Sequence, residues 1–286
     1  MAENGINDIY KARLSPAEFS KLSSFIYHEY GIKMPPIKKT MLESRLQKRL
    51  RALNLSSFRE YVDYVFSKQG QEKEVIQMID MVSTNKTDFF REPGHFEFLE
   101  STCLPDFLKT NSPGVRPFMI WSAGCSSGEE PYTMAICMNE FAEKNKGFDY
   151  SIFATDISTR VLQSGVDAVY NESRVDGLPL YLKYKYFMRN KNPEIRTVRV
   201  VPELRRKVTF HRLNFMDPVY KLDYSFDAIF CRNVLIYFDR DTQESVLNKL
   251  ASKLKKDGIF ILGHSESISN LNVPLAQIKP TIFKKI

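Results

Sequence analysis

The sequence predicts an α/β protein in which an all-helical N-terminal domain precedes a doubly wound parallel sheet with a small antiparallel β insertion. Residues 15–82 carry apolar side chains at helical spacing and few strand signals. From Arg116 onward, short apolar runs alternate with helical segments, which is typical of a parallel sheet covered by helices. Residues 170–207 break that alternation. We therefore expect domains at 1–84 and 85–286, with an inserted β-subdomain at 170–207.

The N-terminal domain is predicted from helix start and stop signals. Ser15 before Pro16 favours a helix start. The prolines at 35 and 36 break the chain, and a new helix begins near Lys38. That helix carries an apolar stripe formed by Leu42, Leu46, Leu50 and Leu53. Further helices are expected from Ser57 through Val65 and from about Glu72 to Val82.

The sheet domain is predicted from its β-rich runs and the helices between them. The runs cover 118–122, 151–155, 208–213, 226–231 and 258–262, with helices at about 129–144, 158–164 and 241–255. The tail at 281–285 adds a last strand. In the insertion, YKYF (184–187) and TVRVV (197–201) predict short strands around a turn at NKNP (190–193).

Composition excludes several classes of protein. With 43% hydrophobic and 26% charged residues in 286, the chain is neither disordered nor fibrous. It has no apolar run of the roughly 18 residues that a membrane span needs and no basic, then apolar, leader. We therefore expect a cytoplasmic protein without membrane insertion. Its four cysteines lack CxxC spacing and do not cluster with the four histidines, so we expect reduced thiols and no metal site.

The positive charge is concentrated in two segments. Residues 38–51 hold six basic side chains against one acid, and residues 183–207 hold nine against two. Since the whole chain carries only +7, the remainder is acidic. Each segment suits an acidic partner, either a nucleic acid or an acidic protein surface.

The most informative segment is the glycine loop within residues 118–131. It predicts a strand, a loop with Gly124 and Gly128, and a helix. The next strand ends in Asp156, 28 residues after Gly128, where nucleotide-binding folds place the carboxylate that accepts ribose hydroxyls. Glu129 and Glu130 open the helix, and their charge repels phosphate but suits a cation. A ligand with a ribose, no phosphate and a positive centre is S-adenosylmethionine.

Five segments resemble the CheR family of chemotaxis receptor methyltransferases. They are TNKTDFFRE (84–92), SAGCSSGEEPYT (122–133), FATDIS (153–158), FDAIFCRNVLIYF (226–238) and GHSES (263–267). The resemblance covers nearly the whole chain and implies a Rossmann-like S-adenosylmethionine-dependent methyltransferase domain. It implies methyl transfer to glutamate side chains of chemoreceptors, as in a protein-glutamate O-methyltransferase of EC type 2.1.1.80, during chemotactic adaptation. The product of the cofactor is S-adenosylhomocysteine.

The resemblance also implies site residues. Arg91 and Tyr237 are the expected catalytic pair, with Arg91 orienting the acceptor carboxylate and Tyr237 shaping the methyl site. Glu129 and Glu130 remain alternatives for the contact with the methionine end of the cofactor. The expected cofactor-binding residues are Asn85, Thr87, Arg91, Gly124, Glu129, Glu130, Asp156, Asn214, Phe215, Arg232 and Asn233.

Substrate binding is expected at the two basic segments. Arg45, Lys48 and Arg49 lie at positions i, i+3 and i+4 of one helix, so they can meet the Glu-rich methylation helices of chemoreceptors together. We expect changes at this contact to leave cofactor binding unaffected. In the insertion, Arg189, Arg196 and Arg199 are expected to hold a C-terminal receptor peptide added as a strand, although Asn190 and Asn192 stand where peptide-binding members tend to have glycines. We expect a monomer.

Two other functions remain open from the sequence. The chain could be a nucleic-acid methyltransferase whose basic segments hold phosphates, although Arg232–Tyr237 lacks the Asp/Asn-Pro-Pro-aromatic pattern common in enzymes that methylate exocyclic amines. It could also be a signalling module that binds without turnover. Methyl-ester formation distinguishes the expected enzyme from both, and we expect no nucleic-acid partner.

Overall fold

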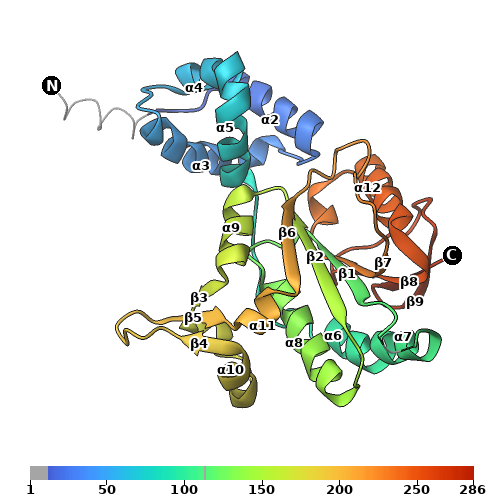
Figure 1. The fold of residues 1–286 in the computed structure, drawn as a ribbon. Coiled ribbons are helices and arrows are strands. Elements are labelled where there is room, and N and C mark those ends of the chain that lie inside the picture. The colour runs from blue at the N-terminus through green and yellow to red at the C-terminus, as the bar shows by residue number, and fades with distance from the viewer. Residues whose placement is uncertain (1–11, 113) are drawn as a thin grey trace.

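The computed structural model describes residues 12–112 and 114–286. Figure 1 shows a helical domain beside a sheet that is flanked by helices. The first eleven residues, which open the expected 1–84 domain and where no leader was expected, lie outside the described residues. In the described ranges, no helix has both the length and the apolar character needed to cross a bilayer.

The N-terminal domain is helical, as predicted. Helix α2 (Pro16–Tyr30) starts with a capping box in which Ser15 Oγ accepts the Glu18 N–H and the Glu18 carboxylate accepts the Ser15 N–H. Helix α5 (Lys68–Val82) starts four residues before the predicted start because Ser67 caps it. The leucines at 42, 46 and 50 are fully buried in a core separate from that of the sheet domain. The remaining helices are η1 (Pro36–Lys38), α3 (Lys39–Ala52), α4 (Phe58–Val65) and α5 (Lys68–Val82).

The main sheet has the order β6-β2-β1-β7-β8-β10-β9. Its five predicted strands pair in parallel, and each lies within a residue or two of its expected bounds except β8, which starts earlier. From β1 the chain winds outward to β2 and β6 and then returns to β7 on the other side of β1. The parallel strands are β1 (Phe118–Ala123), β2 (Tyr150–Asp156), β6 (Val208–Arg212), β7 (Phe226–Cys231) and β8 (Leu254–Leu262). Since ligands bind at such a reversal, beyond the carboxyl ends of the strands, this topology places the site.

Helices cover both faces of this sheet (Figure 1). On one face, β1 side chains such as Ile120 pack with α8, and on the other Trp121 packs in the core that includes α12. Helix α8 (Glu129–Lys144) has its predicted bounds. The other flanking helices are α6 (Gly94–Phe98), the π-helical η2 (Leu99–Cys103), α7 (Leu104–Thr110), α9 (Thr159–Asp167), α11 (Pro202–Arg205) and α12 (Arg240–Ser252).

The sheet departs from the prediction at its carboxyl-terminal edge. The tail forms β10 (Ile282–Lys285), as expected, but it pairs antiparallel with β8 and with the unpredicted β9 (Leu275–Lys279). The sheet is therefore mixed rather than purely parallel. Strand β8 begins at Leu254, so α12 ends at Ser252 and not at the predicted residue 255.

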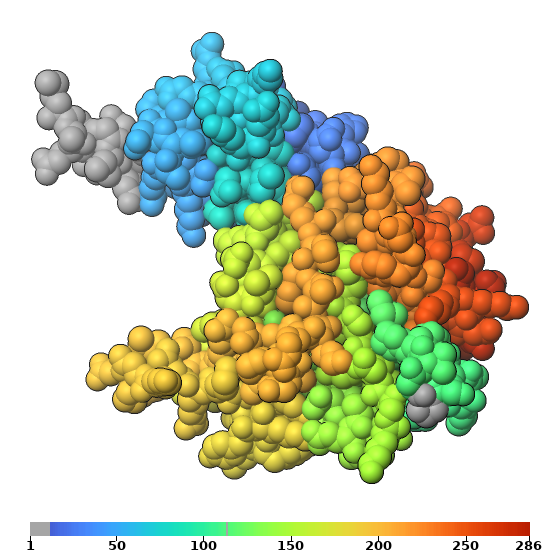
Figure 2. All heavy atoms as spheres, in the orientation of Figure 1, coloured from blue at the N-terminus to red at the C-terminus, as the bar shows by residue number. Residues whose placement is uncertain are grey.

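The insertion contains the expected antiparallel sheet, of order β3-β5-β4, and projects from the body (Figure 2). The strand prediction at 184–187 was wrong except for Phe187. Residues 184–186 belong to α10, because Leu182 and Tyr186, one helical turn apart, are both buried while Tyr184 is exposed. The elements are β3 (Val169–Asn171), η3 (Glu172–Val175), α10 (Leu180–Tyr186), β4 (Phe187–Arg189) and β5 (Thr197–Val200).

Candidate functional site

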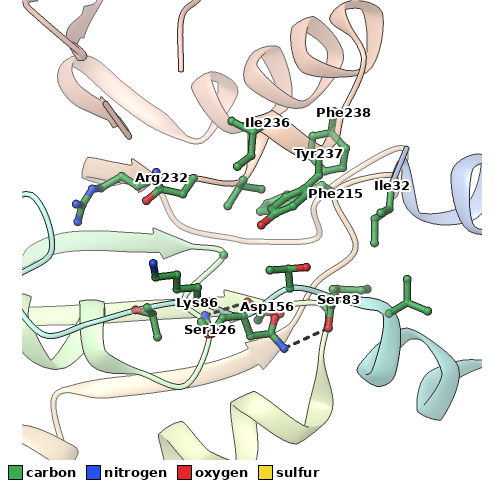
Figure 3. Close-up of a pocket in the computed structure, with 18 of the residues that line it drawn as sticks. Ile32, Ser83, Lys86, Ser126, Asp156, Phe215, Arg232, Ile236, Tyr237 and Phe238 are labelled. Atoms are coloured by element: carbon green, nitrogen blue, oxygen red, sulfur yellow. Dashed lines mark hydrogen bonds between the residues drawn. The ribbon is translucent and has the colours of Figure 1, made fainter. Parts of the chain in front are cut away.

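A cavity of about 420 Å³ lies at the carboxyl ends of β1, β2 and β7, where the N-terminal domain meets the sheet. Its size suits a small-molecule ligand. Figure 3 shows Tyr237 and Phe238 across the cavity from Asp156 and Ser126. The sequence-predicted residues that line it are Asn85, Thr87, Arg91, Gly124, Glu130, Asp156, Asn214, Phe215, Arg232, Asn233 and Tyr237.

The glycine loop takes a shape that brings its backbone to the cavity. Gly124 has φ +90°, and a Cβ there would stand 2.4 Å from Val234 Cγ2, so this position requires glycine. Ser126, which sequence reasoning missed, has φ +49° and donates its N–H to Asp156 at 2.9 Å. Its hydroxyl donates to the Asn85 carbonyl at 3.0 Å. The loop is thus fastened both to β2 and to the segment entering the domain.

Asp156 ends β2 with a buried carboxylate. Its two oxygens accept the N–H groups of Ser126 and Ser158 at 2.9 and 3.0 Å. Burial raises the pKa of this carboxyl, while these backbone hydrogen bonds oppose the rise. Each carboxylate oxygen can accept a second hydrogen bond, so Asp156 can bind a vicinal diol such as that of a ribose.

Glu129 and Glu130 point to different places. Glu130 lines the cavity, where it accepts from Ser122 Oγ at 2.6 Å and from Arg232 Nη1 at 3.0 Å. Burial raises its pKa, and Arg232 opposes that rise. Glu129 is buried outside the cavity lining and pairs with Arg174 of η3 at 2.5 Å. Of these two alternatives, only Glu130 lines the cavity, so we expect Glu130 rather than Glu129 to contact a cofactor.

The segment after β7 is held in a strained turn. Asn233 has φ +60°, and the buried Glu266 carboxylate accepts N–H groups from Asn233, Val234, Leu235 and Gly263 at 2.7–2.8 Å. This anchoring fixes the start of η4 (Leu235–Tyr237), which ends in the cavity-lining Tyr237. Such strain is commonly found at functional sites. Glu266 lies in the GHSES segment, but its role is visible only in the fold.

Arg232 and Arg91 differ in their partners. Arg232 is buried and pairs with Glu92 and Glu130, each at 3.0 Å, and it also donates to the Arg91 carbonyl. The half-buried Arg91 donates to the Lys86 carbonyl at 3.0 Å and makes no ion pair with any described residue. Arg91 can therefore meet an incoming carboxylate, as can Lys38 and Lys86, which line the same cavity and also make no ion pair with a described residue.

The N-terminal domain closes one side of the cavity, which sequence reasoning missed. Lys33 N–H donates to the Tyr237 carbonyl at 3.0 Å, and Asn214 Nδ2 donates to the Glu29 carbonyl at 2.8 Å. Asn214 Oδ1 accepts the Met216 N–H, so both polar atoms of its expected adenine-binding side chain already have partners. Besides residues 82–84, the N-terminal lining comprises Tyr30, Ile32, Met34, Lys38 and Met41. For Tyr30, Ile32 and Met34 the sequence signal was the alternation of apolar residues before the proline pair, and Lys38 belongs to the basic segment that follows it.

The three basic residues expected to meet a receptor do not share one free surface. Arg49 makes a bidentate pair with the buried Glu74, at 2.7 and 2.8 Å. Arg45 donates to the carbonyls of Val82 and Ser83, and both residues line the cavity. Of the three, Lys48 alone is exposed. The joint receptor contact of Arg45, Lys48 and Arg49 stays a prediction, but two of the three residues already have partners within the domain.

The insertion arginines lie on its exposed surface, away from the cavity. Arg189 pairs with Glu172 at 2.8 Å. Arg199 Nε donates to the Asp167 carbonyl at 3.0 Å. Arg174, which was not singled out from the sequence, ties the insertion to the site by bonding Glu129, Asp88 and the Thr87 carbonyl.

Comparisons with known proteins match both domains. Residues 17–83 match the family described as "CheR methyltransferase, all-alpha domain", and residues 85–283 match "CheR methyltransferase, SAM binding domain". The chemotaxis protein methyltransferase of Borreliella burgdorferi is 41% identical over 94% of each chain. Chemotaxis protein methyltransferase 2 of Pseudomonas aeruginosa is 35% identical over 93% of this chain and 92% of its own. The Escherichia coli protein is 38% identical over 90% of this chain and 87% of its own.

Proposed function

The chain belongs to the CheR methyltransferase family, and on that premise we propose that it methylates glutamate side chains of chemoreceptors to form methyl esters. The proposal rests on the contrast between acidic and basic side chains inside one cavity. The acids Asp156 and Glu130 face the space where a ribose and a cationic tail fit, while Arg91 is left without an acidic partner among the described residues. A carboxylate acceptor supplies that missing partner.

The residues of the cavity suit S-adenosylmethionine. We assign the ribose hydroxyls to Asp156, the cationic methionine end to Glu130, and the adenine to the apolar side near Phe215. Bound in this cavity, the cofactor supplies a methyl group on a positively charged sulfur. The ion pair with Arg232 holds the Glu130 carboxylate in position.

The acceptor needs no general base. A glutamate with a pKa of ~4.3 is already ionised at neutral pH. Arg91 orients its carboxylate, and Tyr237, fixed through the turn that Glu266 holds, shapes the site of transfer. Positioning of this kind can lower a barrier by roughly 7–11 kcal/mol. The N-terminal domain, which forms one side of the cavity, excludes water from the carboxylate, whose hydration would weaken it as a nucleophile.

The test is incubation with tritiated S-adenosylmethionine and chemoreceptor membranes, followed by alkaline release of volatile methanol. We expect base-labile label on the receptor, and Arg91→Met should lower kcat with little change in cofactor affinity. Cofactor binding without transfer, or transfer of base-stable label to nucleic acid, would contradict the proposed function. If affinity and kcat fall by the same factor in Arg91→Met, Arg91 is a cofactor-binding residue instead.

Receptor docking through the N-terminal domain rests on Lys48. It is exposed on α3 and makes no ion pair with any described residue. We expect Lys48→Glu to raise the KM for receptor and to leave cofactor affinity unchanged. An exposed cation that faces an acidic helix affects how fast the two proteins associate and how their surfaces align. Receptor kinetics identical to those of the wild type would remove α3 from the docking surface.

Receptor tethering through the insertion rests on its edge strand. Strand β4 pairs with β5 on one side only, and a peptide strand can add to such an edge. Arg189, Arg196 and Arg199 supply positive charge for an acidic tail or its carboxylate. Titration with C-terminal receptor pentapeptides should show binding that Arg196→Ala weakens. If no pentapeptide binds, the insertion has another role.

A further inference from the structure

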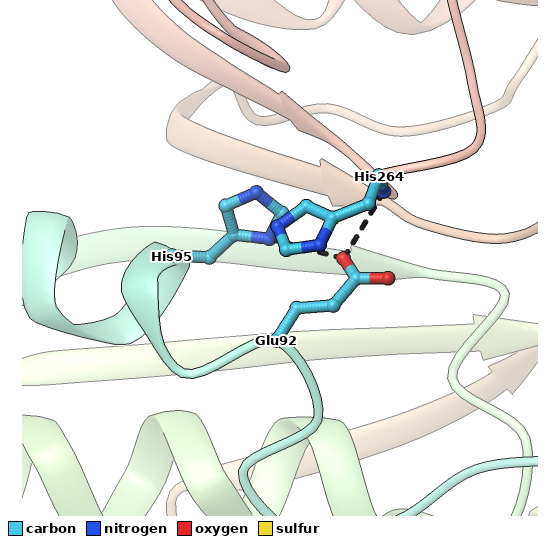
Figure 4. A group of neighbouring side chains, drawn as sticks. All are labelled: Glu92, His95 and His264. Atoms are coloured by element: carbon cyan, nitrogen blue, oxygen red, sulfur yellow. Dashed lines mark hydrogen bonds and ion pairs between the residues drawn. The ribbon is translucent and has the colours of Figure 1, made fainter.

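A cluster of two histidines and a glutamate lies beside the cofactor cavity but outside its lining. Glu92 precedes α6, His95 lies within α6, and His264 follows β8. One ligand atom from each lies within 4.8 Å of the other two. Figure 4 shows both imidazole rings next to the Glu92 carboxylate. The sequence predicted no metal site. His264 lies far along the chain from Glu92 and His95, so the three residues form no motif with the spacing of metal ligands.

The protonation of His95 is fixed by its neighbours. Its Nε2 lies 2.8 Å from Thr281 Oγ1, and that hydroxyl donates its hydrogen to the Pro280 carbonyl at 2.7 Å. Nε2 must therefore be the donor, which leaves a lone pair on Nδ1. As a neutral imidazole, the ring therefore presents Nδ1 as its acceptor atom.

This lone pair has no hydrogen-bond partner. His95 is 3% exposed, and its Nδ1 accepts no hydrogen bond. It faces Glu92 Oε2 at 3.4 Å, so two acceptor atoms point toward each other in a buried place. Leaving such an atom unpaired in a buried place is unfavourable. A cation between the two atoms removes this cost.

The spacing suits a small cation. Zinc lies about 2.0–2.2 Å from nitrogen and oxygen ligands in a tetrahedral site, which places two ligand atoms roughly 3.3–3.6 Å apart. The distance from His95 Nδ1 to Glu92 Oε2 meets this spacing without adjustment. The rings of His95 and His264 are 5.0 Å apart at an interplanar angle of 75°. His264 is exposed, so its ring is free to turn toward the other two ligands.

We propose that Glu92, His95 and His264 bind one divalent transition-metal cation of the zinc type, with the fourth position open to solvent on the His264 side. Two imidazole nitrogens and one carboxylate suit zinc and its neighbours rather than magnesium or calcium, which prefer oxygen ligands. The hydrogen bond from His95 to Thr281 is the outer contact that orients a metal-binding imidazole.

Arg232 limits the affinity of this site. Its Nη2 lies 3.0 Å from the same Glu92 oxygen, so a bound cation shares that carboxylate with a guanidinium. Glu130, on the other side of Arg232 at 3.0 Å, offsets part of the repulsion. Arg232 also lines the cofactor cavity, so it is in contact with both sites.

The experiment is calorimetric titration of the tag-free full chain with Zn²⁺, together with Co²⁺ absorption spectra. We expect one Zn²⁺ per chain, tetrahedral Co²⁺ bands without thiolate charge transfer, and no heat with Mg²⁺. His264→Ala should weaken Zn²⁺ binding at least tenfold, while His28→Ala, at an exposed histidine on α2, should not.

Several results would overturn this proposal. They are the absence of Zn²⁺ binding by wild type, equal affinity in His264→Ala, or a Co²⁺ spectrum of thiolate ligation. Because His264 is exposed, its variant is expected to fold, and an unchanged thermal transition checks this. None of these readouts depends on methyl transfer, so the metal site and the proposed function can fail separately.

Discussion

Arg45 gives the sharpest test of how the N-terminal domain acts on the cofactor site. Its guanidinium donates to the carbonyls of Val82 and Ser83 and lies 3.4 Å from Thr84 Oγ1, and all three of those residues line the cavity. Arg45→Met keeps most of the apolar stem but removes these bonds. We therefore expect the cavity wall to loosen and the affinity for cofactor to fall.

The magnitude follows from the hydrogen bonds. A bond from a charged donor contributes about 1.5–3 kcal/mol, and the lower value applies because Arg45 is only half-buried. If the wall must be ordered before the ligand binds, the apparent Kd rises in inverse proportion to the fraction of protein molecules in which the wall is ordered. About 1.4 kcal/mol corresponds to tenfold, so the loss of one such bond raises the Kd about tenfold, and Arg45→Met, which removes more than one, should raise it at least severalfold.

The assay is calorimetric titration with S-adenosylhomocysteine, and Lys48→Met is the matched control. Lys48 lies on the same helix and is exposed, without a hydrogen bond to any described residue. Its variant should bind within twofold of wild type. Equal Kd values for the two variants would refute the inference that Arg45 supports the cavity wall and would return it to a role in receptor docking.

Three further predictions concern the loop and its acids. Asp156→Asn should weaken cofactor binding about tenfold or more. Burial raises the pKa of Asp156, so on acidification the wild-type affinity for cofactor should begin to fall at a higher pH than it would with an ordinary aspartate. A pH series by calorimetry should show no such fall in the variant. Glu130→Gln should raise the Kd for cofactor more than Glu129→Gln does, since Glu129 bonds Arg174 outside the cavity, and the reverse order would assign the methionine-end contact to Glu129. Gly128→Ala should lower the free energy of unfolding by more than about 1 kcal/mol in urea titration, because Gly128 has φ +97° and a Cβ would meet Gly165 Cα at 3.0 Å, whereas Gly177→Ala, in open space, should not.

Local pattern was enough to predict the framework of the fold. The helices capped by Ser15 and Ser57, the five parallel strands, and the loop leading from Gly124 into α8 follow from spacing, caps and glycine, which act over a few residues. The position of Asp156 at the end of β2 follows from the same local order. Its place beside the glycine loop follows because neighbouring parallel strands end at one edge of the sheet.

Where a sequence pattern is compatible with both helix and strand, only the tertiary structure determines which of the two forms. Residues 184–187 alternate like a strand, but burial of Leu182 and Tyr186 on one side makes most of them helical. Strand β9 exists because β10 lies beside it. In both cases the deciding contact comes from packing against another element, which no local window contains.

The partners of the charged residues were likewise decided only by the fold. The sequence presents Glu129 and Glu130 as equals, and Arg45, Lys48 and Arg49 as one basic face. Partners from elsewhere in the chain give these residues different roles. Glu129 pairs with Arg174 and Arg49 with Glu74, whereas Arg45 supports the cavity wall through the carbonyls of residues 82 and 83 and Lys48 stays exposed. A charge takes its role from the nearest opposite charge or carbonyl in space, and that neighbour lies 25 to 45 residues away in the sequence.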